Sequence, residues 1–299
     1  MKAENTGGQI VAAFGRQYLA RLEDGSEILC LTRGKKSEVV CGDNVEIKHT
    51  GKASTENGSS AQGVIERILP RRSLLHRSDA FREKLIAANV TQIVVVVAAE
   101  PSFSDELLAR CMVAAQDQKL DVLIILNKCD LVETAAQARL RLAPYRAIGY
   151  RVLELSAKQD VTALRPLLQG HISVLVGQSG MGKSTLLNAL HPEAKAATRE
   201  ISSALDSGKH TTTHARLYRL DESSSLIDCP GVQAFGLHHL TFGGIEQGFV
   251  EFAQYLGLCR FRDCHHTHEP GCAIRGAVET GKINARRLDL FQQISRTKS

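Results

Sequence analysis

A segment in the middle of the chain combines glycines, a lysine and hydroxyl side chains at the spacing of a phosphate-binding loop. Its sequence is Gly-Gln-Ser-Gly-Met-Gly-Lys-Ser, at positions 177–184. The glycines let the backbone bend so that its N–H groups face phosphate oxygens, while Lys183 can reach the β- and γ-phosphates and Ser184 can bind Mg²⁺. The predicted contacts to the nucleotide from this segment are Gly177, Gln178, Ser179, Gly180, Met181, Gly182, Lys183, Ser184 and Thr185.

The residues that recognise guanine in GTPases are present in a second segment. Asn127, Lys128 and Asp130 form an Asn-Lys-x-Asp element after the apolar stretch 121–126. The carboxylate of Asp130 can accept hydrogen bonds from N1–H and from the exocyclic amine of guanine, whereas adenine would leave this carboxylate unpaired. Lys128 is expected to lie over the base and Asn127 to brace the phosphate loop. The segment therefore predicts selectivity for guanine nucleotides.

A short turn supports this prediction. Ser156, Ala157 and Lys158 follow the apolar stretch 151–155. In GTPases a Ser-Ala-Lys turn supplies a backbone N–H to O6 of guanine. Each short motif alone is weak evidence, since a solvated charged turn has the same residues. The prediction of a guanine site depends on finding them together with the phosphate loop.

Two further segments have the residues of a nucleotide-dependent switch. Asp228 and Gly231 form an Asp-x-x-Gly element at the end of the apolar stretch 225–227. There the aspartate would contact Mg²⁺ through water, and the glycine N–H would meet the γ-phosphate. Thr212 lies in a Gly- and Ser-containing loop before a predicted strand, where a switch threonine would bind Mg²⁺ in the GTP state. The predicted Mg²⁺ ligands are Ser184, Thr212 and Asp228.

One position of the switch departs from many GTPases. Val232 follows Gly231 where those enzymes have the glutamine that orients water, and an apolar side chain cannot do this. His210 is a candidate substitute, and the alternative is that it is a solvated switch residue. The predicted catalytic residues are His210, Lys183 and Thr212.

The order of these motifs is unusual. A conventional GTPase has the phosphate loop first and the guanine-recognition element last, whereas here segments 127–130 and 156–158 precede segment 177–184. Circular permutation relocates the chain ends without changing which strands are neighbours, so the sheet can still form. The switch near Gly231 then becomes the end of this fold and leads directly into the C-terminal region. Loss of the γ-phosphate could reorient that region.

The C-terminal region contains a cluster of metal-ligand residues. Cys259, Cys264, His266 and Cys272 provide three thiolates and one imidazole, a closed tetrahedral set suited to one structural zinc ion. His265 or His268 could replace His266, and buried cysteines beside a histidine-rich surface are the alternative to a metal site. The other five cysteines are expected to be core or turn residues: Cys30, Cys41, Cys111, Cys129 and Cys229.

The N-terminal region has the pattern of a small β-barrel. Strands are predicted at 9–13, 17–22, 27–31, 44–48 and 63–68, with a polar loop at 50–60. Five short strands fit an oligonucleotide-binding (OB) barrel, and an SH3-like barrel has a similar sequence pattern.

Apolar strands alternate with helical stretches after residue 72, which indicates a mainly parallel sheet covered by helices. Strands are predicted at 92–99, 121–126, 151–155, 172–176, 215–219 and 225–227, and helices at 105–118, at 135–148 and from 183. Beyond residue 236 the pattern is helical around the Cys/His cluster. The fold class is therefore multidomain: an OB barrel at 1–72, an α/β P-loop GTPase domain of permuted order at 73–236, and a mainly α zinc-binding domain at 237–299.

Composition and charge are those of an ordinary globular protein. The 299 residues are 43% hydrophobic, and 37 Lys plus Arg against 32 Asp plus Glu give a net charge of +5. This mild basic excess is compatible with nucleic acid but does not establish it. The sequence shows no secretion signal and no apolar run long enough to span a membrane, so we expect a cytoplasmic protein with reduced thiols and no membrane partner.

The motifs at 127–130, 156–158, 177–184, 210–213 and 228–231, with the four metal-ligand residues, resemble the RsgA (YjeQ) family over nearly the whole chain. These are bacterial GTPases that depend on the small ribosomal subunit. The resemblance implies an OB barrel, a permuted GTPase domain and a zinc domain, and a role in late maturation of that subunit. It further implies GTP hydrolysis that the subunit stimulates, release of the protein afterwards, and a role for His210.

Contact with rRNA has weaker support from the residues themselves. Phe14 and Tyr18 are the evident stacking platforms of the barrel, so phosphate contacts would have to dominate. Basic residues that could supply them are Arg33, Lys35, Lys36, Arg67, Arg71, Arg72, Arg77, Lys282, Arg286 and Arg287. The alternatives to a ribosome-linked GTPase are an RNA-binding scaffold with a structural nucleotide and a nucleic-acid-dependent ATPase. The protein is expected to be a monomer.

Overall fold

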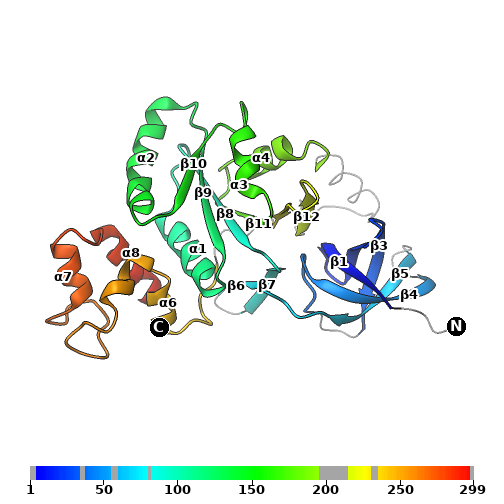
Figure 1. The fold of residues 1–299 in the computed structure, drawn as a ribbon, viewed down its shortest axis with the longest axis horizontal. Helices are drawn as coiled ribbons and strands as arrows, with labels where there is room; N and C mark the ends of the chain where they lie inside the picture. The colour runs from blue at the N-terminus through cyan, green and yellow to red at the C-terminus, as the bar shows by residue number, and fades with distance from the viewer. Residues whose placement is uncertain are drawn as a thin grey trace.

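The computed structural model describes residues 5–33, 38–54, 60–79, 82–194, 215–229 and 235–296. Three units follow one another along the chain and lie from right to left in Figure 1. We call them the barrel, the central unit, which is an α/β sheet, and the C-terminal unit, which consists of helices and loops. The predicted site residues His210, Thr212 and Gly231 lie outside the described residues.

The barrel is built from β1 (Asn5–Phe14), β2 (Gln17–Leu22), β3 (Glu27–Thr32), β4 (Asn44–Ser54) and β5 (Ser60–Ile68). Hydrogen-bonded neighbours follow the order β1-β2-β3-β5-β4, and β4 closes the barrel on β1. The β3–β5 pair is parallel and the other four pairs are antiparallel. This is the strand order of an OB barrel, so that prediction is confirmed and the SH3-like alternative is excluded. The predicted loop at 50–60 is too long, because β4 continues to Ser54 and β5 already begins at Ser60.

The barrel interior is filled by apolar side chains, among them Ile10, Tyr18, Val45 and Ile47. Gly63 makes room for them, since a Cβ atom there would lie 2.6 Å from Cγ2 of Ile47. Tyr18 is only 2% exposed. Its prediction as a stacking platform for RNA bases is therefore wrong, because its ring belongs to the core.

A hairpin that the sequence did not predict connects the barrel to the central unit. It consists of β6 (Leu74–Asp79) and β7 (Arg82–Ala88). Beside it, Arg71 donates to both carboxylate oxygens of the buried Asp43, at 2.7 and 2.9 Å. The Asn89 side chain donates to the carbonyl of Gly42 at 2.9 Å. Arg71 thus fixes the junction of the two units and does not offer its charge to a phosphate.

The central sheet has the strand order β10-β9-β8-β11-β13-β12. Its strands are β8 (Gln92–Ala98), β9 (Asp121–Asn127), β10 (Arg151–Glu154), β11 (Ile172–Val176), β12 (Arg216–Arg219) and β13 (Ser225–Asp228). β12 is antiparallel to β13, and the other pairs are parallel. β12 also pairs with β1, so the sheet continues into the barrel. The predicted mainly parallel sheet is confirmed.

The helices of the central unit are α1 (Asp105–Asp117), α2 (Val132–Ala147), η1 (Thr162–Leu164), α3 (Arg165–Leu168) and α4 (Lys183–Leu190). All seven residues of β8 are buried, as expected for a parallel strand covered on both faces. Because parallel strands end at the same edge of a sheet, the segments that follow β9, β10, β11 and β13 are brought together. Ligands of open α/β sheets bind at this edge.

The C-terminal unit contains α6 (Phe242–Gln247), η2 (Val250–Tyr255), α7 (Ala273–Glu279) and α8 (Ala285–Arg296). Within residues 235–296 there is no strand, which confirms the predicted helical character. Its core includes three phenylalanines, with the Phe291 ring edge-on to Phe249 and Phe252 at 5.4 and 5.3 Å between centroids. No helix within the described residues combines the length and apolar character needed to cross a bilayer.

A buried arginine fastens the C-terminal unit to the central unit. Arg287, on α8, is 2% exposed and donates to both carboxylate oxygens of Glu251, at 2.5 and 3.2 Å. Its guanidinium lies 4.4 Å from the ring centroid of Phe249 and 5.2 Å from that of Tyr145 on α2. It also contacts the sulfur of Met112 on α1 at 3.9 Å. The prediction that Arg287 contacts phosphate is therefore wrong.

We expect Arg287→Met to destabilise the protein by about 3–5 kcal/mol, because it leaves the Glu251 carboxylate buried without a counter-charge. The double variant Arg287→Met/Glu251→Gln should recover much of this loss, because neither charge remains. Urea denaturation of the variants measures both effects. A loss below about 1 kcal/mol in the single variant would contradict this account.

Candidate nucleotide and metal sites

The phosphate loop connects β11 to α4 at the carboxyl edge of the central sheet. Two of its glycines are required by close approaches. A Cβ atom on Gly177 would lie 2.3 Å from the carbonyl oxygen of Val96, and one on Gly182 would lie 2.2 Å from Nδ2 of Asn127. Gly182 is also the N-cap of α4, with a left-handed backbone at φ 93°. The loop can therefore pack against β8 and β9 only with glycine at these positions.

Asn127 connects three of the predicted motifs. At the end of β9 it is 2% exposed, and its Nδ2 donates to the carbonyl of Met181 in the phosphate loop at 2.9 Å. Its Oδ1 accepts from the backbone N–H of Ala157, also at 2.9 Å. The expected brace between Asn127 and the phosphate loop is thus present. Segments that are far apart in the chain converge on one buried amide.

We expect Gly182→Ala to weaken GDP binding at least tenfold, because the new Cβ would displace the Asn127 amide and the left-handed backbone disfavours alanine. A fluorescent guanine nucleotide titration measures this. Gly276→Ala is the matched control, since a Cβ at this helical position meets no atom within 4 Å. It should leave affinity unchanged and stability equal or higher. Equal affinities of the two variants would contradict the expectation.

Lys183 and Asp228 lie near one another at the phosphate loop. Nζ of Lys183 donates to the carbonyls of Gly177 and Gln178 at 2.6 and 2.8 Å. Asp228 ends β13, opposite Leu175 of β11 in the parallel register. Burial raises the pKa of Asp228, which the charge of Lys183 partly offsets, and burial lowers the pKa of Lys183. Ser179, Gly180, Ser184 and Thr185 are exposed, so this side of the loop is open to a ligand.

The predicted guanine residues lie next to the phosphate loop. A hydrogen bond from the Ser156 side chain, and the charges of Lys158 and Lys128, lower the pKa of Asp130. Asp130 and Lys158 are exposed. Lys128 has a left-handed backbone at φ 61°, and its Nζ donates to the carbonyl of Glu100 at 2.7 Å. An ionised carboxylate is therefore available to accept from donors of a base.

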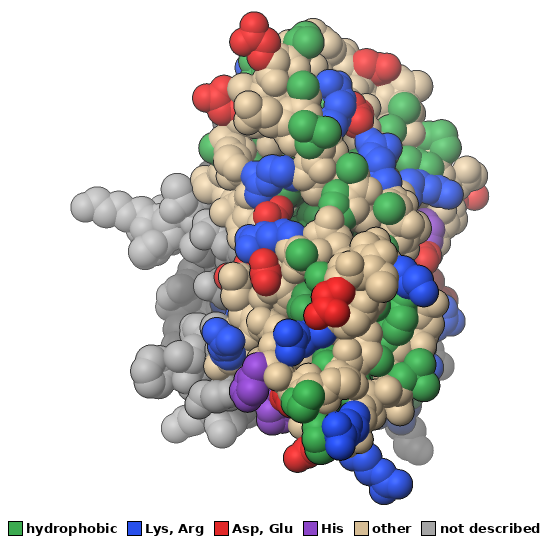
Figure 2. All heavy atoms as spheres, turned by 90° about the vertical axis from the view of Figure 1, so that its left-hand side faces the viewer, with side chains coloured by type: hydrophobic (Ala, Val, Ile, Leu, Met, Phe, Trp, Pro, Cys, Tyr) green, Lys and Arg blue, Asp and Glu red, His purple; other side chains and the backbone are tan. Residues whose placement is uncertain are grey.

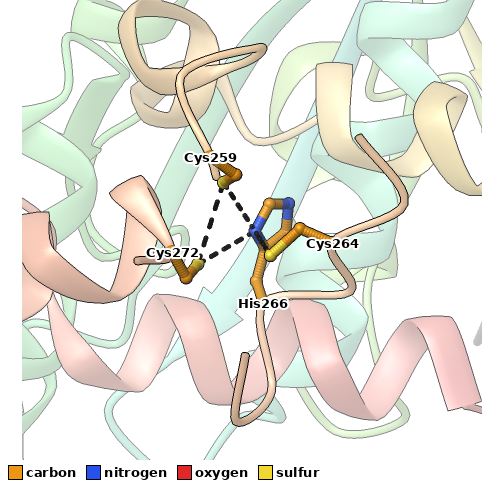
Figure 3. A group of neighbouring side chains, drawn as sticks. All are labelled: Cys259, Cys264, His266 and Cys272. Atoms are coloured by element: carbon orange, nitrogen blue, oxygen red, sulfur yellow. Dashed lines mark hydrogen bonds between the residues drawn. The ribbon is translucent and has the colours of Figure 1, made fainter. Parts of the chain in front are cut away.

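The Cys/His cluster of the C-terminal unit is assembled as predicted. Figure 3 shows the side chains of Cys259, Cys264, His266 and Cys272 pointing toward one another, and their ligand atoms all lie within 4.8 Å of one another. Nδ1 of His266 is the nitrogen that faces the sulfurs, at 3.2 Å from Cys272 and 3.5 Å from Cys264. Neither His265 nor His268 belongs to this cluster. Three thiols and one imidazole form a set that could hold one metal ion.

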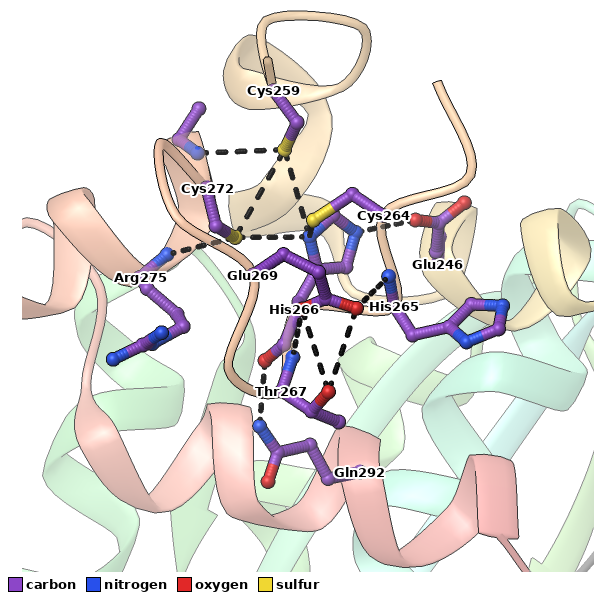
Figure 4. Close-up of polar contacts among 11 residues, drawn as sticks. Glu246, Cys259, Cys264, His265, His266, Thr267, Glu269, Cys272, Arg275 and Gln292 are labelled. Carbon is purple, nitrogen blue, oxygen red and sulfur yellow. Dashed lines mark hydrogen bonds and ion pairs between the residues drawn. The ribbon is translucent and has the colours of Figure 1, made fainter. Parts of the chain in front are cut away.

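Further contacts orient these side chains (Figure 4). Nε2 of His266 lies 2.6 Å from a carboxylate oxygen of Glu246, on α6. At the start of α7, the N–H groups of Ala273 and Arg275 point at the sulfurs of Cys259 and Cys272, at 3.4 and 3.5 Å. A carboxylate behind a histidine ligand and N–H groups aimed at thiolates are common at metal sites. Sequence reasoning missed Glu246, because nothing in its local pattern marks it.

Other predicted residues have structural roles. Cys30, Cys41, Cys111 and Cys229 are buried and Cys129 is half-buried, which confirms them as core or turn residues. Arg33 is paired with Glu66 at 2.6 Å, and Arg67 with Glu46. On the face that includes α7, basic and acidic side chains are interspersed (Figure 2). Four of the arginines predicted to contact phosphate are already paired with carboxylates, so they support such contacts less than the sequence suggested: Arg33, Arg67, Arg71 and Arg287.

Comparisons with known proteins agree with this architecture. The family model of the RsgA GTPase matches residues 68–238. A "small ribosomal subunit biogenesis GTPase RsgA" from Nitrosospira multiformis is 54% identical over 287 residues, covering 96% of this chain and 89% of that protein. The protein of the same name from Burkholderia pseudomallei is 52% identical over 296 residues, covering 97% and 92%.

Solved structures agree along the whole chain. YjeQ from Thermotoga maritima has a TM-score of 0.74 at 28% identity and covers 99% of both chains. YloQ, described as a circularly permuted GTPase, has a TM-score of 0.69 at 27% identity and covers 99% of this chain and 95% of its own. The permuted motif order is thus shared with a solved relative, and the chain belongs to the RsgA GTPase family.

Proposed function

We propose that this protein hydrolyses GTP to GDP and phosphate and acts as a biogenesis factor in late maturation of the small ribosomal subunit. In this proposal the subunit stimulates hydrolysis, and hydrolysis is coupled to release. The observation that carries the GTPase site is the buried Asn127 amide, which joins the guanine-recognition segment to the phosphate loop and to the Ser-Ala-Lys turn. The ribosomal role rests on the names of relatives that are more than 50% identical.

Guanine is recognised by Asp130, which accepts from N1–H and the 2-amine. Lys128 lies over the base, and a backbone N–H of the turn 156–158 donates to O6. The phosphates lie along residues 177–185, where exposed backbone and Lys183 meet them. In this proposal Asp228 contacts Mg²⁺ through water, and the N–H of Gly231 binds the γ-phosphate. The geometry of Asn127 and Lys183 supports these assignments, because both side chains already point into the loop.

Hydrolysis requires a water molecule in line with the γ-phosphate, and His210 is the candidate that orients it. Mg²⁺, held by Ser184, Thr212 and Asp228, would neutralise charge on the β- and γ-phosphates. Burial raises the pKa of Asp228 because it disfavours the charged carboxylate. A bound Mg²⁺ would stabilise the charged form, so the position is consistent with a role in Mg²⁺ binding. Lys183 stabilises negative charge on the same phosphates.

The metal of the C-terminal unit is proposed to be one structural zinc ion, bound by Cys259, Cys264, His266 and Cys272. The closed donor set and the contact of Glu246 with the far nitrogen of His266 support this choice. The ion would fix the loop that precedes α7. The proposed domain boundaries are residues 1–72, 73–236 and 237–299, and we propose a cytoplasmic monomer that contacts rRNA.

The test is GTP turnover by the purified protein alone and with purified small subunits, at fixed Mg²⁺ and moderate salt. A large stimulation supports the ribosome-dependent switch. An unchanged slow rate with both mature and immature subunits would favour a scaffold whose nucleotide is structural. Equal affinity for GTP and ATP in a parallel titration would overturn the guanine assignment.

A further inference from the structure

A loop outside the predicted motifs contacts two segments of the proposed nucleotide site. Residues 99–104, which we call the β8–α1 loop, follow β8 at the same sheet edge as the phosphate loop. The carbonyl of Glu100 accepts from Nζ of Lys128 at 2.7 Å. The N–H of Ser104 donates to Oε1 of Gln178 at 2.7 Å. One short loop therefore contacts both the residue expected over the base and a side chain of the phosphate loop.

The middle of the β8–α1 loop also packs against the phosphate loop. A Cβ atom on Gly180 would lie 3.4 Å from Cγ of Pro101, so the proline ring lies directly beside this glycine. Ser104 is the N-cap of α1, and its hydroxyl accepts from the N–H of Leu107 at 3.2 Å. The loop is thus fixed at its α1 end, and its remaining residues need another anchor.

Arg141, on α2, is that anchor. Its guanidinium donates to the Ser102 hydroxyl at 2.6 Å and to the Phe103 carbonyl at 2.7 Å. It also donates to Asp105 at 2.9 Å and lies 4.0 Å from the ring centroid of Phe103. The Phe103 side chain is 4% exposed and belongs to the core. A planar guanidinium can satisfy three acceptors and stack on a ring at once, which an ammonium cannot.

We propose that Arg141 is a positioning residue for guanine-nucleotide binding. It holds the β8–α1 loop, and through Glu100 and Ser104 that loop keeps Lys128 and Gln178 in place before the nucleotide arrives. Because preorganisation lowers the cost of binding, loss of this anchor weakens nucleotide affinity although Arg141 itself contacts no nucleotide. This inference rests on the nucleotide site of the proposed function.

The same anchor reaches the C-terminal unit. The second carboxylate oxygen of Asp105 lies 3.4 Å from Nε of Arg286 on α8. Asp105 is therefore shared between Arg141 of the central unit and Arg286 of the C-terminal unit. Through Arg141 and Asp105, the β8–α1 loop is thus connected to the C-terminal unit by contacts that do not involve the switch segment.

The test is the GDP dissociation constant of the full-length protein, measured by competition with a fluorescent guanine nucleotide. We expect Arg141→Ala to weaken binding about 5- to 20-fold. Arg139→Ala is the matched control on the same helix, since Arg139 is also partly exposed but pairs with Glu154 at 2.7 Å, away from the loop. It should change the constant less than about twofold. Arg141→Lys should not restore affinity, because lysine keeps the charge but lacks the planar guanidinium that donates to several acceptors at once.

A double-mutant cycle separates positioning from general destabilisation. In the Lys128→Ala/Gln178→Ala background, Arg141→Ala should change GDP affinity less than about twofold, because the contacts through which it acts are gone. The same loss in both backgrounds, equal constants for Arg141→Ala and Arg139→Ala, or full rescue by lysine would each overturn the inference. Failure of the wild-type protein to bind GDP would instead overturn the proposed function.

Discussion

Replacing Asp130 by asparagine is expected to exchange guanine for xanthine as the preferred base. The Asp130 carboxylate is exposed at the carboxyl edge of the sheet, and its pKa is lowered by the Ser156 side chain and by two lysines. An ionised carboxylate accepts from both N1–H and the 2-amine of guanine. An asparagine amide can accept only one of these and opposes the other, whereas xanthine has an oxygen at position 2 that can accept from the amide.

We expect Asp130→Asn to weaken GDP binding on the order of 100-fold or more and to gain binding of XDP, as measured by competition titration. Asp121→Asn is the control, since Asp121 lies at the opposite end of β9 with a side chain that is 75% exposed. It should leave both affinities unchanged. A variant that still prefers GDP would show that Asp130 does not contact the base.

The pH dependence of binding provides a second check on Asp130. A carboxylate with a lowered pKa is ionised above that pKa and loses its contribution only as the pH falls through it. Between about pH 5 and pH 8, titration of Asp130 should therefore not alter the GDP dissociation constant.

Loss of the proposed zinc ion is expected to unfold the loop of the C-terminal unit that surrounds the Cys/His cluster. The four ligand side chains are held by one another, by the start of α7 and by Glu246 of α6, and apolar packing around residues 257–272 is sparse, with Leu258 66% and Phe261 43% exposed. In small domains folded by zinc, binding contributes on the order of 10 kcal/mol. The phenylalanine core should survive, because the rings of Phe249, Phe252 and Phe291 contact one another directly.

Cys272→Ser should therefore abolish the one equivalent of zinc that we propose for the wild-type protein, and proteases should cut within residues 257–272. Zinc released to a chromophoric chelator after thiol modification measures the stoichiometry. His268→Ala is the control, because His268 lies next to the cluster but outside it. One equivalent of zinc in Cys272→Ser would exclude this ligand set.

Much of the architecture could be predicted from local patterns. The bounds of β2 and β11 are those predicted, and α1 begins at Asp105 as expected. Apolar runs and turn residues are short-range signals that fix each element by itself. The hairpin of β6 and β7 was missed, because residues 74–88 contain charged side chains in place of an apolar alternation.

Residue types at fixed spacing were enough to predict the chemistry: a phosphate loop, a guanine-recognition element and a set of three thiols with one imidazole. The tertiary structure decided what each remaining side chain is used for. Tyr18 is core, Arg71 and Arg287 are buried ion-pair partners, and Arg141 anchors the β8–α1 loop. The carboxylate partners of Arg71 and Arg287 lie 28 and 36 residues away in the chain. Such pairings follow from how the sheet and the helices pack. Local sequence contains no signal for them, because a side chain's burial and partner are set by elements that are distant in the chain.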